Sequence, residues 1–307
     1  MLTLFTTGKA FAGHSGVIQR NALKSWKLLH PDVEVIVFGD EEGAAEACRD
    51  LGLRHEAHVE RNEAGLKRID YYFDRAQELA RHGVLCYVNC DIILTRDFLH
   101  AVEQVRNARS KFLMVGRRWD TDVSAPLNFG EARWAKEIRR QACSAGRQRA
   151  AQWIDYFAFS KGLYLKKIPP FVIGRVNWDN WLVWFADHAG ARVIDASRMV
   201  VAVHQNHDYS YHPQGETGVW HDAQSQRNFR LAGGHKHLRT IANARFLLTP
   251  GGIVPNRWHA VHHYLWTLRR WRIFLGTRAL NLWQSYAWHP FLNGTRSVRH
   301  ALGLRRS

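Results

Sequence analysis

The sequence predicts an α/β fold built on a mostly parallel mixed sheet that is flanked by helices. Short apolar runs rich in β-branched and aromatic residues alternate with longer segments of helical period, as expected for strands joined by crossover helices. The chain has 307 residues, 46% of them hydrophobic, which suffices for a large packed core. Its four cysteines stand at irregular spacings that fit neither a disulfide framework nor a paired-cysteine zinc site, so we expect a reducing compartment.

The first strands and helices follow from these apolar patterns. Strands are expected at residues 2–7, 33–40 and 84–89, and the last of them, VLCYVN, is apolar enough for a central strand covered on both faces. Helices are expected at residues 17–29 and 41–51. A third helix ends near Gly83 and carries an apolar stripe at helical spacing, formed by Leu66, Ile69, Phe73, Ala76 and Ala80.

The later elements continue the alternation. The run KFLMVGRRWD, residues 111–120, predicts one strand, and a helix with Trp134 and Ile138 on one face is expected after it. Further strands are expected at residues 156–160, 193–195 and 200–204.

Charge divides the chain into two parts. All 27 acidic residues lie at or before Asp222, whereas residues 223–307 contain 14 of the 43 Lys and Arg residues and no acid. Residues 1–222 therefore carry 43 − 14 = 29 basic and 27 acidic residues, and the net charge of +16 belongs mostly to the remainder. We predict an α/β domain at residues 1–222 and a basic, partly helical C-terminal appendage at residues 223–307.

The appendage has two interpretations. Residues 256–307 hold five of the 13 tryptophans and nine arginines, a mixture that favours the boundary between water and an anionic membrane. Alternatively, a helix packs back onto the domain through an apolar face that contains Trp258, Val261, Leu265 and Leu268. Because no apolar run approaches about 18 residues and the N-terminus lacks a signal-peptide pattern, we expect a cytoplasmic protein, peripheral at the inner face of the cytoplasmic membrane where the tail binds it.

Polar residues follow several of the predicted strands. In open α/β sheets, ligands bind beyond the carboxyl ends of the strands, so these residues are expected to line one crevice. A carboxylate there holds a hard metal ion through oxygen, and arginines or a cation balance a diphosphate. Each residue is alone also compatible with a cap or a turn. The group comprises Thr6, Thr7, Gly8 and Lys9, then Asp40, then Asn89 and Asp91, and then Arg117, Arg118 and Asp120.

The segment YVNCDIIL, residues 87–94, resembles the D-x-D motif of glycosyltransferases of the GT-A fold, the nucleotide-diphospho-sugar transferases, and of bacterial family 2 in particular. The resemblance covers most of residues 1–222 and implies a Rossmann-like sheet. In those enzymes the motif binds Mn²⁺ or Mg²⁺ together with the nucleotide diphosphate. It implies that Asp91 supplies most of the ligand charge here, because Asn89 offers only a neutral oxygen.

A second segment, PPFVIGRVNWDNWLVWFA, predicts a helix that starts at Asn177 or Trp178 with Asp179 in its first turn. The resemblance to inverting enzymes implies that Asp179 is the general base that deprotonates the acceptor hydroxyl. An acid at this position is also what an ordinary helix prefers. Trp178, Asn180 and Trp181 are candidates for the acceptor side, although the tryptophans equally suit core packing.

A third segment, VAVHQNHDYSYHPQG, places three histidines and an acid close together after a strand. The resemblance implies that His204 is a further ligand of the metal or the diphosphate. A zinc site built on His204 and His207 is the alternative, though the segment has no thiolate and no helical i, i+4 spacing. His207 is also an acceptor-side candidate, and His212 ranks behind His204.

Four basic residues and a cysteine complete the candidates. Arg117, Arg118 and Arg68 suit phosphate oxygens, and surface salt bridges are the alternative for each. For Lys67 the salt bridge is favoured. Cys90 is expected to be a small buried side chain, because nothing beside it lowers the pKa of the thiol.

Taken together, the sequence predicts a glycosyltransferase, a hexosyltransferase-like enzyme that moves a sugar from a nucleotide-sugar donor to a hydroxyl of a glycan or lipid-linked acceptor. A divalent metal ion, Mn²⁺ or Mg²⁺, is the expected cofactor, and inversion and retention both stay open. The alternative is a basic nucleic-acid-binding protein that uses the Arg- and Trp-rich tail. It is disfavoured because the excess of positive charge is absent from the α/β domain at residues 1–222, and because no DNA- or RNA-binding motif is present. A dinucleotide-dependent oxidoreductase or a methyltransferase is opposed by the glycine spacing after the first strand, at residues 8, 13 and 16.

Overall fold

The structure, a computed structural model, describes residues 1–108, 111–208 and 214–259. Two compact units divide the chain, Met1–Asn256 and Arg257–Ser307. The domain boundary predicted at residue 222 thus falls inside the first unit. Most of the Trp- and Arg-rich tail, with Val261, Leu265 and Leu268, lies outside the described residues. Both interpretations of the tail therefore stay predictions. In the described part of the chain, no helix combines the length and the apolar character that crossing a membrane requires.

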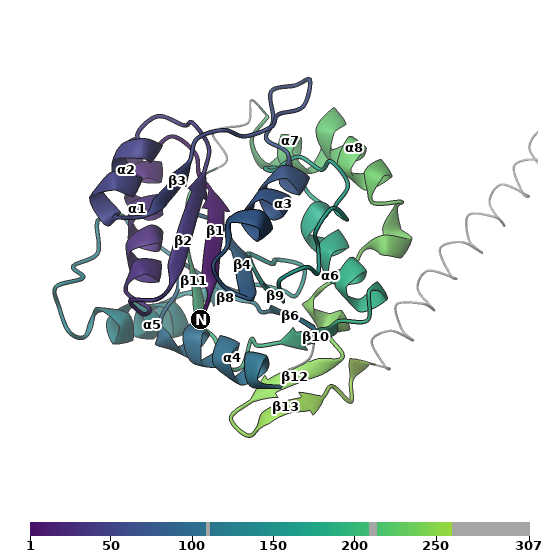
Figure 1. Cartoon of the computed structure of the whole chain (residues 1–307). Helices are drawn as coiled ribbons and strands as arrows, with labels where there is room; N and C mark the ends of the chain where they lie inside the picture. The colour runs from purple at the N-terminus through teal and green to yellow at the C-terminus, as the bar shows by residue number, and fades with distance from the viewer. Residues whose placement is uncertain (109–110, 209–213, 260–307) are drawn as a thin grey trace, which may run out of the picture. The chain divides into compact units, whose positions relative to one another are not determined.

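A nine-stranded sheet forms the centre of the first unit (Figure 1). β9 and β13 run antiparallel to their neighbours and the other pairings are parallel, so the predicted mostly parallel mixed sheet is confirmed. In spatial order the strands are β13 (Gly252–Pro255), β12 (Phe246–Thr249), β10 (Arg192–Asp195), β6 (Phe112–Val115), β9 (Tyr156–Ser160), β4 (Val84–Val88), β1 (Thr3–Thr7), β2 (Glu34–Phe38) and β3 (Arg54–Glu56).

Helices cover both faces of this sheet (Figure 1). Alternate residues of β4 belong to two separate cores, because successive side chains of a strand point to opposite faces. One core packs against α1 (Gly13–Lys27), α2 (Ala44–Leu51) and α4 (Arg96–Asn107), and the other against α3 (Ile69–Leu79) and α6 (Trp178–His188). The remaining helices are α5 (Trp134–Ala145), α7 (Gly215–His221), α8 (Ala223–Leu231), η1 (His235–His237) and η2 (Ile241–Asn243).

A small second sheet stands beside the large one. Its order is β5 (Ile92–Ile93), β11 (Ala202–Gln205), β7 (Arg118–Thr121) and β8 (Arg147–Gln148). The single strand predicted at residues 111–120 is therefore wrong, since β6 belongs to the large sheet and β7 to the small one. The chain changes sheets at Gly116, where a Cβ would lie 2.0 Å from Tyr156 Oη, so only glycine fits this bend.

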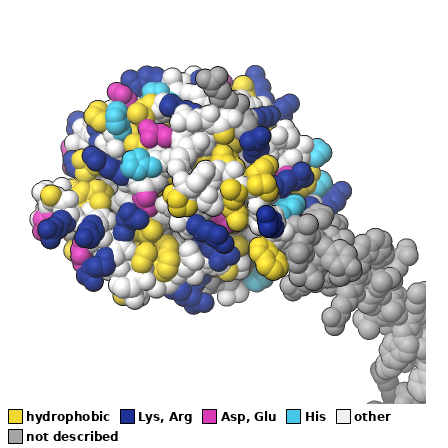
Figure 2. Space-filling view, turned by 90° about the horizontal axis from the view of Figure 1, so that it is seen from below, with side chains coloured by type: hydrophobic (Ala, Val, Ile, Leu, Met, Phe, Trp, Pro, Cys, Tyr) yellow, Lys and Arg dark blue, Asp and Glu magenta, His cyan; other side chains and the backbone are white. Residues whose placement is uncertain are grey.

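The other strands and helices expected from apolar patterns are present, with ends shifted by a few residues. The sequence analysis did not predict α4, α7, α8, or the short strands β3, β5 and β8. It also missed β12 and β13, which extend the large sheet beyond residue 222 and thereby move the domain boundary. On the face of the molecule in Figure 2, Lys and Arg side chains are scattered among hydrophobic, histidine and uncharged side chains.

Replacing Gly146 by alanine is expected to destabilise the fold. A Cβ at Gly146 would lie 2.4 Å from the carbonyl oxygen of Ala142 and 2.6 Å from that of Asp120, so the backbone of the second sheet must move. Overpacking of this kind costs about 1–3 kcal/mol, measured as the free energy of unfolding in urea. Gly83→Ala is the matched control, because a Cβ there meets nothing within 4 Å and its effect should stay within about 0.5 kcal/mol. Equal losses in both variants would contradict the packing of Gly146 against β7.

Candidate functional site

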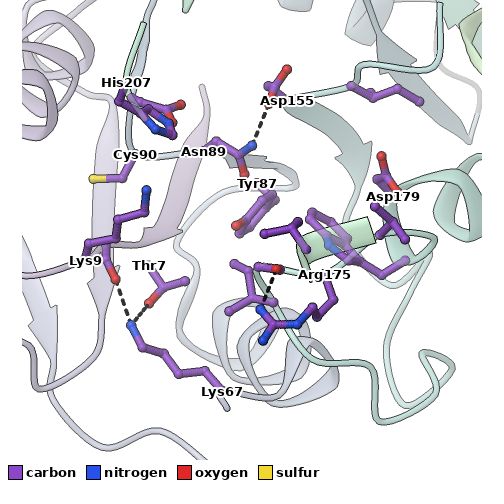
Figure 3. Close-up of a pocket in the computed structure, with 18 of the residues that line it drawn as sticks. Thr7, Lys9, Lys67, Tyr87, Asn89, Cys90, Asp155, Arg175, Asp179 and His207 are labelled. Atoms are coloured by element: carbon purple, nitrogen blue, oxygen red, sulfur yellow. Dashed lines mark hydrogen bonds and ion pairs between the residues drawn. The ribbon is translucent and has the colours of Figure 1, made fainter. Parts of the chain in front are cut away.

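A pocket of about 480 Å³ opens at the carboxyl ends of the parallel strands (Figure 3). Residues from both sheets line it, because β4 and β1 end there, β9 starts there, and β7 and β11 of the small sheet run beside them. The residues after Val172 and the first turn of α6 close another side. The crevice expected at the strand ends is thus present, although its membership differs from the prediction.

Asp91, His204 and His207 form a cluster at one side of this pocket. One potential ligand atom from each residue lies within 4.8 Å of the others, and this is the only such grouping of His, Cys, Asp and Glu found among the described residues. Asp91 Oδ2 is 3.0 Å from His207 Nε2 and 3.7 Å from His204 Nε2. The sequence predicts Asp91, Asn89 and His204 as metal ligands and ranks His207 lower, whereas the geometry groups Asp91 and His204 with His207.

The pairing of β11 brings the histidines to Asp91. β11 runs antiparallel to β5, which follows Asp91 directly, and pairs His204 with Ile92. Gln205 fixes this register, since its backbone N–H donates to the Asp91 carbonyl at 3.2 Å and its side-chain amide donates to the same oxygen at 3.1 Å. The same amide also donates to the Ile18 carbonyl at 2.7 Å, and Gln205 is fully buried. The relative position of acid and imidazole is therefore set by the backbone.

The cluster favours a charged Asp91. Burial opposes ionisation, yet the neighbouring His204 and His207 outweigh it and hold the pKa of the Asp91 carboxyl far below its usual value. Burial likewise opposes protonation of His207, but the hydrogen bond to Asp91 raises the pKa of this imidazole. Asp91 Oδ1 is buried and has no hydrogen-bond partner among the described residues. A buried carboxylate oxygen without a partner is unfavourable unless a cation binds it, so the donor set fits a divalent metal ion.

A buried ion-pair network of Arg118, Asp120 and Asp155 lies next to the cluster. Arg118 donates to Asp120 at 2.8 Å and to both oxygens of Asp155 at 3.0 Å, and all three are largely buried. Asp120 Oδ1 lies 3.3 Å from His204 Nδ1, and the other imidazole nitrogen of His204 faces Asp91 at 3.7 Å. Asn89 donates its amide to Asp155 Oδ1 at 2.6 Å (Figure 3). The predicted phosphate contact of Arg118 is thus replaced by pairing with carboxylates, which raises the pKa of the guanidinium further.

Asp179 lies across the pocket from this cluster, in the first turn of α6 (Figure 3). Asn177 precedes the helix with φ +83°, a left-handed conformation that turns the chain into α6. Asp179 Oδ1 is shielded from solvent and has no hydrogen-bond partner in the described part of the chain. Burial and the negative charge of Asp155 raise the pKa of Asp179 to about 7. A carboxyl with this pKa exchanges protons near neutral pH, as a general base must.

Lys67 occupies the end of the pocket beside β1. Its ammonium donates to Thr7 Oγ1 and to the Gly8 carbonyl, both at 2.8 Å, and pairs with Glu41 at 2.5 Å (Figure 3). The salt bridge favoured from the sequence for Lys67 is present, but Lys67 is only 8% exposed, so the pair is buried and does not lie at the surface. Thr7, Gly8 and Lys9 line the pocket as predicted.

Besides Asp120, five predicted site residues lie away from the pocket lining. Asp40 is exposed and bonds Arg61 at 2.6 Å, and Glu41 takes its place at the pocket. Thr6 is fully buried in β1. Arg68 is held by Asp70 and Glu60. The other two are Arg117, whose backbone bridges Ile154, and Trp181, which packs into the core against Phe171 and Phe185.

The remaining candidates have mixed outcomes. Trp178 lines the pocket but is 6% exposed and packs on Tyr87 and Phe157, so it serves mainly as a wall. Asn180 lines the pocket and donates its amide to the Arg239 carbonyl at 2.9 Å. Burial raises the pKa of the Cys90 thiol, as expected for a small buried side chain. His212 lies outside the described residues.

Two residues that sequence reasoning missed are central to the site. Asp155 is the residue just before β9, and because β9 runs antiparallel, its start lies at the same edge of the sheet as the ends of β1 and β4. Knowing the direction of β9 would have identified it. Trp153, two residues earlier, lines the pocket together with Trp220 of α7.

No family model matches the chain, and no curated protein is similar to it in sequence. Solved structures with a similar arrangement include glucosyl-3-phosphoglycerate synthase from Mycobacterium tuberculosis in complex with phosphoglyceric acid, at 15% identity and a TM-score of 0.47 over 76% of this chain and 80% of that one. TarS residues 1–349 from S. aureus with UDP-GlcNAc is similar at 11% identity and 0.44, over 67% and 58%. A mannosyltransferase from Pyrobaculum calidifontis with GDP-Man and Mn²⁺ follows at 13% and 0.40, over 66% and 56%. Similarity of this degree concerns the course of the chain and assigns it no substrate or reaction.

Asp179→Asn is expected to stabilise the protein increasingly as the pH rises from about 4 to about 7. An unfolded-chain aspartate has a pKa of about 4, whereas the folded value is about 7. Between these values the native state binds a proton that the unfolded chain has released, so the wild type loses stability as the pH rises. The variant lacks this titration. The difference in Tm between variant and wild type should grow with pH and level off above about 7, and a difference independent of pH would mean that the pKa of Asp179 is not raised.

Proposed function

We propose that this protein is a metal-assisted glycosyltransferase that moves a sugar from a nucleoside-diphosphate sugar to an acceptor hydroxyl. The observation that carries the proposal is the pair of opposed groups in one pocket. On one side a buried carboxylate and two imidazoles converge within 4.8 Å, and on the other stands a carboxyl whose pKa is about 7. A site for a cation and a site for a proton are what this transfer requires.

The donor side consists of Asp91, His204 and His207 as ligands for Mn²⁺ or Mg²⁺. When bound, the ion supplies positive charge that neutralises the diphosphate and stabilises it as a leaving group. The chain's own part is to hold three ligands in register through the Gln205 contacts and to orient His204 through Asp120. Two imidazoles and one carboxylate also suit Zn²⁺, so zinc belongs in any test of the site.

The acceptor side is assigned to Asp179. Its carboxylate accepts the proton of the acceptor hydroxyl while that oxygen forms a bond to the anomeric carbon. The bond from the anomeric carbon to the diphosphate oxygen breaks, and its electron pair leaves with the diphosphate. Asp179 Oδ1, which is shielded from solvent and has no hydrogen-bond partner among the described residues, is the oxygen that we assign to accept this proton.

Nucleic-acid binding receives less support from the described residues. The scattered Lys and Arg side chains in Figure 2 do not form a continuous stripe on that face.

Removing Asp91 is expected to abolish the metal-dependent part of nucleotide binding. A ligand that binds only the native state raises its Tm, so UDP- and GDP-sugars should raise the Tm of the wild type more with Mn²⁺ or Mg²⁺ than without. In Asp91→Asn that increment should disappear, since loss of a ligand weakens metal binding by about tenfold or more. Asp32→Asn, a change at a 71% exposed carboxyl outside the pocket, is the control and should behave as wild type. Nucleotide binding that ignores both metal and Asp91 would refute the metal site, and a response to Zn²⁺ alone would favour the zinc alternative.

Asp179→Asn is expected to lower turnover by about two or more orders of magnitude while donor binding persists, because an amide cannot accept the proton. In the wild type the rate should rise about tenfold per pH unit up to the pKa of about 7 and then level off, since only the ionised carboxylate acts as a base. The measurement is product formation from the donor identified by the Tm panel.

Asp187→Asn provides the control for this variant, because Asp187 lies near the other end of α6 and pairs with Arg245 outside the pocket. Its turnover should match the wild type. Wild-type turnover in Asp179→Asn would remove Asp179 from the role of base.

A further inference from the structure

The indole rings of Trp153 and Trp220 form an aromatic corner of the pocket. Neither residue belongs to the metal cluster or acts as the proposed base. Trp153 precedes β9, and Trp220 lies in the last turn of α7. Their ring centroids are 5.6 Å apart and their planes meet at 74°, so one ring stands nearly perpendicular to the other. Trp220 is 37% exposed, one of few large hydrophobic side chains at the surface of the described residues.

We infer that Trp220, with Trp153 beside it, is the platform on which a neutral sugar ring of the acceptor stacks. This inference rests on the proposed function. An indole exposed at the wall of a ligand pocket leaves apolar area in water that a ligand can cover. Pyranose rings present a face of C–H groups together with hydroxyls at the edge, and the large flat indole suits the first while the polar wall of the pocket suits the second.

The backbone on either side of Trp220 is anchored to the pocket wall. Asp222, two residues later, pairs with Arg175 at 2.6 Å and also caps α8 by accepting from the backbone N–H of Ser225 at 2.7 Å. Ser225 in turn donates its hydroxyl to the Val219 carbonyl at 2.5 Å. These contacts fix the end of α7 against the Arg175 segment of the pocket wall. A side chain ordered before binding loses less entropy when a ligand arrives.

Two arginines pack against the ring of Trp153. The guanidinium carbon of Arg149 lies 4.2 Å from the centre of its ring and that of Arg118 lies 5.0 Å away, both within the range of cation–π attraction. Because Arg118 also pairs with Asp155, the aromatic corner is joined to the network behind the metal cluster.

The charges of the pocket favour a neutral acceptor over an anionic one. Four of its cationic side chains are each already paired with a carboxylate, so binding a phosphate or carboxylate group would require breaking an ion pair. These pairs are Arg118 with Asp155, Arg175 with Asp222, Arg61 with Asp40, and Lys67 with Glu41. Hydroxyl groups and an apolar ring face make no such demand.

Saturation-transfer NMR on the full chain tests the inference. Octyl β-glucoside below its micellar concentration carries a sugar ring and an alkyl chain in one molecule, and methyl glucoside, methyl galactoside and methyl mannoside carry the ring alone. Glycerol 3-phosphate represents anionic acceptors. With Mg²⁺ and UDP or GDP present, we expect saturation of ring protons in at least one glycoside, and a weaker signal or none from glycerol 3-phosphate. Mg²⁺ is used because paramagnetic Mn²⁺ would broaden the ligand signals.

Variants locate the contact. Trp220→Ala should weaken glycoside binding about tenfold, while Trp220→Phe should restore most of it because a phenyl ring still offers a flat face. Trp258→Ala is the matched control, since Trp258 is 68% exposed and does not line the pocket. Nucleotide binding with Mn²⁺, measured by Tm, should persist in all three variants and thereby reports that they fold.

The outcomes separate this inference from the proposed function. Nucleotide binding without any ring-proton signal, saturation confined to the octyl chain, stronger binding of glycerol 3-phosphate, or equal glycoside binding by Trp220→Ala would each overturn the aromatic platform and leave the transferase intact. Absence of nucleotide binding under every metal would instead overturn the proposed function, and the platform with it.

Discussion

The contact of Gln205 with the main chain of Asp91 is the constraint on which the candidate site depends. It attaches β11, a strand from late in the sequence, to the turn that follows the central strand β4. Gln205 is fully buried, and its amide is satisfied on three sides by Asn21, Ile18 and Asp91. A buried amide without partners is costly. A shift of β11 by one residue would break the hydrogen bonds of the Gln205 amide and turn the side chains of β11 to the opposite face of the sheet. The register that follows leaves His204 beside Asp91.

The pocket also shifts the pKa values of two aspartates in opposite directions. Asp91 lies among imidazoles and near Arg118, and its pKa is lowered, whereas Asp179 is shielded without a cationic partner in the described structure, and its pKa is raised to about 7. Asp155 contributes to the second effect, because its negative charge disfavours a charge on Asp179. The different environments of these two carboxyls keep Asp91 ionised and let Asp179 exchange protons near neutral pH.

Sequence reasoning found the features that depend on local pattern and missed those that depend on strand direction and pairing. Asp91 was predictable because an apolar strand ends just before it, and Asp179 because it opens an apolar helix. Asp155 was not, since nothing in the run YFAFS tells that β9 is antiparallel. Arg117 and Arg118 differ only in which side of an extended segment they occupy, and a pattern of residues cannot decide this without the pairing partner. Three tryptophans spaced by three around α6 likewise could not be divided into core and pocket.

The predicted domain boundary at residue 222 failed for an instructive reason. Charge asymmetry located it at the last acidic residue, but net charge concerns solubility and partners and carries no information about packing. Asp222, the last acid, pairs with Arg175 and caps α8, while Ala232, Ile241 and Ala244 beyond it belong to the same core as the residues before it. The hydrogen bond from the Ser225 backbone N–H to Asp222 therefore crosses the predicted boundary, next to the pocket wall that carries Trp220. Residues on both sides of position 222 thus fold as one unit, which net charge could not reveal.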